Sequence, residues 1–145
     1  MLVAGEGAGP LLRLKAPISF WGGVDPVSGR VADPRHPDWG RCIAGTVLMV
    51  PSAVGSSSSS AIMLELLRNG TAPAAVLMGR ADAILALGVV VGRELGYASI
   101  PVVEVGAAEL AGLEDGTALR VTSDGRVEGA GPAFRAGTGP ATFPG

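Results

Sequence analysis

A strand, a glycine turn and a helix follow one another near the middle of this chain. Thr46 to Val50 is a short run with a β-branched bias, and Pro51 ends any strand pairing that it makes. Gly55 can adopt the backbone angles that a tight turn needs. After the run Ser56 to Ser60, apolar residues recur at i,i+4 spacing, and Asn69-Gly70 is a stop signal. The stretch therefore predicts a strand joined to a helix through a polar turn.

The start of that helix favours negative charge, because its first N–H groups are free and the helix dipole points its positive end there. Ser56 is thus placed where its own alkoxide, or a substrate carboxylate, would be stabilised. Two other interpretations stay open. A serine run can be a flexible linker, although linkers are not usually bounded by an apolar strand and an apolar helical stripe. Plain helix capping explains one or two of the serines and leaves the others without a reason.

The segments that follow repeat the alternation of strand and helix. Residues 74–78 and 100–105 are apolar enough to be buried strands. Between them, Asp82 is a suitable N-cap for a helix that ends at Leu95 before Gly96. One stripe of this helix carries Ile84, Leu87, Val91 and Leu95. The order predicts an α/β domain with parallel strands at 46–50, 74–78 and 100–105 and right-handed crossovers.

The two ends of the chain are read more simply. Leu11 to Phe20 alternates loosely and predicts a first strand that Pro17 interrupts. Near the other end, Ser123-Asp124-Gly125 separates two short β-prone runs and predicts a hairpin. We expect residues 1–130 to form a single domain and the Gly- and Pro-rich residues 131–145 to form a tail.

Two loops between the first strand and the serine run contain turn-forming and polar residues that are candidates for a functional site. Trp21 to Gly29 gathers turn formers around Asp25-Pro26, a good start for a turn. Functional and purely structural interpretations of this loop have equal weight. Asp33 to Gly40 holds the single histidine, His36, which either lines a site or caps the loop. With no second histidine or cysteine pair nearby, we expect no metal site on this chain.

Composition narrows the function further. Of the 145 residues, 48% are hydrophobic and 17% are charged, against a usual ~25%, so either the interior is well filled or part of the surface is covered by a partner. A net charge of −2 and 4% aromatic residues argue against nucleic-acid binding. The single cysteine, Cys42, excludes an internal disulfide and is read as a buried core residue.

No membrane or export signal is indicated. Residues 1–10 lack a basic segment followed by an apolar run, and the uncharged apolar stretch 83–92 is far shorter than the ~20 residues of a membrane span. We therefore expect a soluble, cytoplasmic protein.

Phosphate-binding loops, dinucleotide fingerprints and paired-cysteine clusters are also missing from the sequence. A polar helix start in a chain with few charges predicts half of an active site, shared with a second polypeptide.

Several motifs in order resemble those of the small, swivelling subunit of the aconitase X group. They are Phe20-Trp-Gly-Gly-Val-Asp-Pro26, Asp33, His36-Pro37, Gly45, the Pro51 to Ser60 stretch and Gly70-Thr-Ala-Pro73. The resemblance runs from about Pro17 to Val103. It implies a swivelling β/β/α domain, as in the swivel domain of aconitase and the isopropylmalate isomerase small subunit. Those more distant relatives carry Gly-Ser-Ser-Arg-Glu-His, where this chain has serines at 58, 59 and 60. The leading serine can be carried over, whereas the arginine that grips a substrate carboxylate cannot.

The resemblance also implies a function. It predicts a two-subunit hydro-lyase whose large subunit holds an iron or iron–sulfur centre that polarises the departing hydroxyl, while Ser56 removes the proton next to the carboxylate. No cofactor is expected on this chain. The residues expected to bind a small hydroxy-acid substrate are Gly55, Ser57, Ser58, Gly23, Asp25 and His36.

Members of that group dehydrate cis-3-hydroxy-L-proline or mevalonate 5-phosphate. A phosphorylated substrate would require several basic groups, and the only candidates near the predicted site are Arg30, Arg35, Arg41 and Arg80. Hydroxyproline is therefore preferred. Two non-enzymatic alternatives remain. One is a swivelling phosphohistidine carrier, for which His36 is out of place, and the other is a purely structural subunit.

Overall fold

The computed structural model describes residues 3–16, 18–50, 58–79, 83–105, 114–129 and 142–143. Its strands are β1 (Gly7–Arg13), β2 (Val47–Val50), β3 (Ala75–Met78), β4 (Val102–Glu104), β5 (Ala118–Val121), β6 (Val127–Gly129) and β7 (Thr142–Phe143). Its helices are α1 (Phe20–Gly23), α2 (Ser58–Asn69) and α3 (Ala83–Glu94). The strands join in the order β4-β3-β2-β1-β5-β6-β7. The first four are parallel to one another, and the last three are antiparallel to their neighbours.

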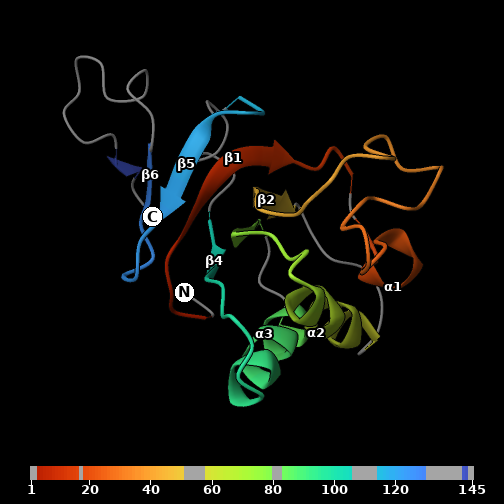
Figure 1. Cartoon of the computed structure of the whole chain (residues 1–145). Coiled ribbons are helices and arrows are strands. Elements are labelled where there is room, and N and C mark those ends of the chain that lie inside the picture. Colours follow the sequence, from red (N-terminus) through yellow and green to blue (C-terminus); the bar gives the residue numbers. More distant parts are fainter. Residues whose placement is uncertain are drawn as a thin grey trace.

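Three layers result from the alternation of side chains along the parallel strands. Leu12, Leu48, Val76 and Val102 face α2 and α3 and belong to the larger core cluster. Their chain neighbours Leu11, Val47, Leu77 and Val103 point to the opposite face, where they pack with side chains of β5 and β6. Figure 1 shows α2 and α3 side by side on one side of the parallel strands, with the β5 and β6 strands on the other. This is a swivelling β/β/α arrangement, so the predicted fold class is confirmed.

The three predicted parallel strands and both main helices are confirmed, with bounds that differ by one or two residues. The helical i,i+4 pairs are buried as their spacing predicts, and they are Ile62 with Leu66 and Met63 with Leu67. Gly70 and Gly96 follow the two helices with φ of 73° and 85°, angles that glycine adopts without strain. The hairpin of β5 and β6 is confirmed as well.

The first strand lies earlier than predicted. β1 covers Gly7–Arg13, and Phe20 belongs to α1, where its side chain is fully buried. A glycine-rich start does not indicate a strand locally, but β5 supplies its pairing partners from more than a hundred residues away. Gly9 is required there, because the carbonyl oxygen of Gly45 occupies the place of a Cβ atom.

The apolar stripe of α3 is the second feature for which the sequence pattern and the packing in the structure differ. Its inward side chains are Leu85, Ala86 and Val89, whereas the predicted stripe of Ile84, Leu87, Val91 and Leu95 lies at the surface. The inner contact is close, since a Cβ atom on Gly88 would lie 2.6 Å from the carbonyl oxygen of Ser60 in α2. None of the helices in the described ranges is long and apolar enough to cross a membrane.

The interpretation of Cys42 as a core residue is wrong. Its thiol is exposed and lies 3.6 Å from the carbonyl oxygen of Ser28. Cys42 pairs with Arg30 in an isolated bridge between two loops, and the neighbouring Ile43 takes the fully buried position instead. Alternation along an irregular segment decides which of the two side chains points inward.

Candidate active site

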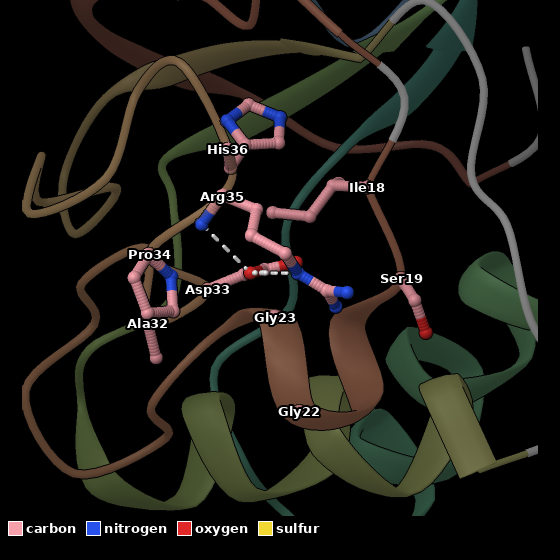
Figure 2. A pocket seen from close by; sticks show the side chains of 9 residues that line it. All are labelled: Ile18, Ser19, Gly22, Gly23, Ala32, Asp33, Pro34, Arg35 and His36. Atoms are coloured by element: carbon pink, nitrogen blue, oxygen red, sulfur yellow. Dashed lines mark hydrogen bonds and ion pairs between the residues drawn. The ribbon is translucent and has the colours of Figure 1, made fainter.

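Two of the loops that carry predicted site residues, the one with Gly23 and the one with His36, meet at a pocket beside α1. β1 leads into residues 14–23 at its carboxyl end, which is the edge of a parallel sheet where α/β domains commonly bind ligands. The cavity has a volume of about 430 Å³, within the usual size range of small-molecule sites. It is lined by Ile18, Ser19, Gly22, Gly23, Ala32, Asp33, Pro34, Arg35 and His36 (Figure 2).

One wall of the pocket is the single turn of α1. Its N-cap is Ser19, and Gly22 allows the chain to turn with a φ of 77°. The Val24 N–H closes the turn by donating to the Phe20 carbonyl oxygen at 3.2 Å. A Cβ atom at Gly23 would lie 3.0 Å from Cγ1 of Ile18, so a side chain there would press into the pocket lining. Phe20 is buried beneath this turn and anchors it to the core.

The opposite wall is the loop from Ala32 to His36, and it carries the charges. The Asp33 carboxylate accepts hydrogen bonds from the backbone N–H of Arg35 at 2.9 Å and from its Nε at 3.2 Å. The backbone N–H, and after it the guanidinium, hold the pKa of Asp33 below its usual value. Figure 2 shows the Arg35 side chain extending across the pocket towards α1. The Arg35 side chain is 91% exposed, so its remaining N–H donors are available to an anion.

His36 and Asp38 hold this loop from beneath. The backbone N–H of Asp38 donates to His36 Nδ1 at 3.0 Å, which leaves the Nε2 proton to donate to the Ala16 carbonyl oxygen at 3.1 Å. Both ring nitrogens of the neutral histidine therefore have partners within the chain. His36 lines the pocket, but its polar atoms are engaged in fixing the loop to the segment after β1.

Asp38 is the buried charge of the region, with a side chain that is 0% exposed. One carboxylate oxygen accepts from the Lys15 backbone N–H at 2.8 Å, and the other from Arg41 Nη1 at 3.3 Å. Arg41 also reaches Asp115 at 2.7 Å, which ties the loop to the start of the hairpin. No feature of the sequence marked Asp38. Arg41 is a neighbour three residues along the chain, but only the tertiary structure brings the Lys15 backbone N–H to the carboxylate and buries it.

The predicted site residues divide into three groups. Gly23 and His36 line the same pocket, although they come from different loops. Asp25 does not line it, because its carboxylate accepts from the Val27 N–H at 3.0 Å and the Ser28 hydroxyl at 3.1 Å within its own turn. The Val27 N–H, followed by the Ser28 hydroxyl, keeps the pKa of Asp25 low.

The third group is the serine run. Gly55, Ser56 and Ser57 lie outside the described residues, and Ser58 is the first residue of α2. Because α1 contacts α2, the pocket and the helix that follows the serine run are neighbours.

Of the four arginines considered for an anion, one lines the cavity. Arg35 does so, whereas Arg30 donates to the Gly40 carbonyl oxygen at 2.9 Å and Arg41 is engaged by Asp38 and Asp115. Arg80 lies outside the described residues.

Ser19 was not predicted as a site residue, and its position before the Phe20-Trp-Gly-Gly turn was the available signal. Within the described ranges, no group of three or more His, Cys, Asp or Glu side chains could hold a metal ion.

Ser59, in the first turn of α2, does not face solvent. It is 2% exposed and lies on the inner face of α2, together with Ile62 and Met63. Its hydroxyl oxygen has no hydrogen-bond partner among the described residues. Since a buried hydroxyl without a partner costs about 1–3 kcal/mol, this position weakens the fold.

Ser59→Ala is therefore expected to raise the thermal midpoint by about 3 °C, corresponding to about 1 kcal/mol in a domain of this size. The substitution removes the unpaired hydroxyl and favours the helix slightly. Thermal unfolding followed by circular dichroism measures the shift. Ser60→Ala, at a partly exposed position of the same turn, is the matched control and should change the midpoint much less. A lower midpoint for Ser59→Ala would show that its hydroxyl has a stabilising role.

Comparison with known proteins places this architecture in a family. The model of the aconitase X swivel domain matches residues 1–129. A crystal structure of Thermococcus kodakaraensis aconitase X in its holo-form superposes with a TM-score of 0.78 at 34% identity, covering 90% of this chain and 94% of that one.

Two groups of relatives differ in length. The chain is 47% identical over 105 residues to the cis-3-hydroxy-L-proline dehydratase of Pseudomonas aeruginosa, covering 72% of this chain but 18% of that protein. It is 41% identical over 121 residues to the phosphomevalonate dehydratase small subunit of Methanothermobacter thermautotrophicus, covering 83% of this chain and 88% of that one. The chain thus spans less than a fifth of the length of the hydroxyproline dehydratases that it matches, with 18% and 17% in two cases. The chain belongs to the aconitase X swivel domain family.

Proposed function

We propose that this chain is the small subunit of an aconitase X-type hydro-lyase, and that it is active only with its large subunit. The observation that carries the proposal is the match to a phosphomevalonate dehydratase small subunit over 83% of this chain and 88% of that one. The hydroxyproline dehydratases also support the proposal, because only 18% of one such protein matches this chain and the rest of that protein lies outside the match. A swivel region of this kind is thus a separate small subunit in one group of relatives and a small part of a longer polypeptide in the other.

In the proposed reaction, Ser56 removes the proton from the carbon next to the substrate carboxylate. It stands two residues before α2 begins at Ser58, where free N–H groups and the helix dipole favour an alkoxide. Gly55, Ser57 and Ser58 are proposed to bind the carboxylate through N–H or hydroxyl groups. No group of three or more His, Cys, Asp or Glu side chains among the described residues could hold a metal ion, and the iron or iron–sulfur centre is proposed to lie on the large subunit.

The preferred substrate is cis-3-hydroxy-L-proline. Arg35 is the only arginine or lysine that lines the pocket among the described residues, and Asp33 neutralises part of its charge. One such cation suits a single carboxylate, whereas a substrate with an additional phosphate requires more positive charge. Mevalonate 5-phosphate remains the second candidate, because the relatives that match over nearly their whole length are phosphomevalonate dehydratase small subunits.

The isolated chain is expected to bind no iron and to dehydrate neither substrate. Together with the aconitase X large subunit of the same genome, it should release water from cis-3-hydroxy-L-proline and give a pyrroline carboxylate. Iron analysis of each purified component and a product assay by mass spectrometry test this. If the two subunits together dehydrate mevalonate 5-phosphate but not cis-3-hydroxy-L-proline, the choice of substrate is reversed. Robust dehydration by this polypeptide without a large subunit would overturn the shared active site.

A further inference from the structure

The exposed apolar surface of the described residues is concentrated on one helix. Seven large apolar side chains are exposed; four of them belong to α3, and a fifth, Leu95, directly follows its last residue, Glu94. The five are Ile84, Leu87, Val90, Val91 and Leu95, with exposed fractions of 37%, 52%, 40%, 38% and 57%. We call these five residues the α3 outer face. In Figure 1, α3 lies at the margin of the helical layer with α2 on one side of it.

The sequence of α3 is that of a helix buried on all sides. From Ala83 to Gly92 it contains no charged residue, while Leu85 and Val89 already fill its inner face. Arg93, at its end, is turned back onto its own chain and donates to the Ala4 carbonyl oxygen at 3.0 Å and to the Ser99 hydroxyl at 3.1 Å. A helix that is apolar all round belongs in an interior, so the outer face indicates a partner surface.

The neighbouring helix shows the contrast within the same layer. α2 buries its apolar side chains against the sheet and presents Glu65 and Arg68 outwards, where they form an ion pair at 2.8 Å. Ion pairs of this kind are ordinary on a solvated helix face. The two helices are equal in length and pack against each other, yet only α3 keeps an uncharged outer side. The apolar surface is therefore specific to one helix of the layer.

We infer that the α3 outer face is the surface through which this chain binds an apolar patch of the aconitase X large subunit. The inference rests on the proposed function, which supplies the partner. In the hydroxyproline dehydratases, the sequence that matches this chain is 18% or 17% of a much longer polypeptide, so the swivel region has a large covalently attached neighbour. As the separate small subunit proposed above, this chain requires a surface that holds the same kind of neighbour without a covalent link. An uncharged apolar helix face can supply that affinity through burial alone.

The position of α3 suits a shared active site. The helix begins after the carboxyl end of β3, at the same edge of the parallel strands at which β1 leads into the pocket segment and β2 leads into the serine run. A large subunit that is seated on α3 from its first turn would reach this edge. Binding and completion of the site would then be coupled by geometry.

Leu87→Glu and Val91→Glu test the inference, because each places a charge at the centre of the outer face in a side chain that is already exposed. The matched control is Val27→Glu, since Val27 is 75% exposed, lies in the Asp25 turn rather than on α3, and does not line the pocket. Biolayer interferometry with the immobilised large subunit measures the dissociation constant. Each α3 variant should bind at least ~100-fold more weakly, the scale of a central interface position, whereas the control should stay within about threefold of the unsubstituted chain. Circular dichroism melting shows that all three variants are folded.

The outcomes separate the two proposals. If the unsubstituted chain does not bind the large subunit, the proposed function fails. If it binds and the α3 variants bind equally well, the proposed function stands and the inference about α3 is wrong. If Leu87→Glu instead converts a homodimer into a monomer without weakening binding of the large subunit, a second copy of this chain covers the outer face, and the inference is again overturned.

Discussion

Ser56→Ala in the reconstituted two-subunit enzyme is expected to lower kcat at least ~10²-fold, the usual scale for a positioned acid–base group. The reason is chemical, because a serine hydroxyl is far too weak a base at neutral pH unless its alkoxide is stabilised. The sequence places Ser56 after Gly55 and just before α2, where helix N–H groups can provide that stabilisation. Folding and binding of the large subunit should stay unchanged, since the substitution removes a single oxygen atom.

Two measurements test this prediction. Steady-state dehydration of cis-3-hydroxy-L-proline gives kcat, and exchange of the α-carbon proton with solvent reports proton removal directly. Ser60→Ala is the control in the same run and should retain most of the activity. Ser57→Ala and Ser58→Ala should raise KM more than they lower kcat if these residues hold the carboxylate. Near-normal turnover and exchange in Ser56→Ala would place the base on the large subunit.

Asp38→Ala is expected to destabilise the fold by about 2–4 kcal/mol, the scale for removing one partner of a buried charged network. Its carboxylate is fully buried and receives the Lys15 backbone N–H and the Arg41 guanidinium, so the substitution leaves a part-buried N–H group without its acceptor. The thermal midpoint should fall by about 10 °C for a domain of this size. The loop from Ala32 to His36 should also loosen, which would raise KM in the reconstituted enzyme.

Asp33→Ala is the matched control for stability, because Asp33 belongs to the same loop but pairs with the Arg35 side chain, which is 91% exposed. Its midpoint should stay within about 2 °C of the unsubstituted chain, as is usual for a solvated ion pair. Asp38→Asn tests whether the charge of the carboxylate or its shape is responsible for the loss in thermal midpoint, because an asparagine has the same shape without the charge. It keeps an acceptor for the Lys15 N–H and should recover part of the loss. A midpoint for Asp38→Ala within 2 °C of the unsubstituted chain would show that the Asp38 network does not stabilise the loop.

The candidate site could be predicted in part. The loops containing Gly23 and His36 were recognisable from their turn formers and their motifs, and the structure brings both residues to one pocket. Asp25 was marked for the same reason, yet its carboxylate is used within its own turn. A residue type that builds turns and binds ligands equally well does not reveal which task it performs until its neighbours are placed.

What the sequence by itself determined is the local order of elements. β2, α2, β3, α3 and β4 follow from apolar runs, helical spacing and glycine stops, because these signals act between residues that are close along the chain. The tertiary structure alone decided the start of β1, which takes its partner β5 from more than a hundred residues away, and the burial of Asp38 against the Lys15 backbone N–H, 23 residues earlier in the chain. It also decided which side of α3 faces outwards, because that helix is apolar all round and only packing against α2 and the sheet selects the inner side.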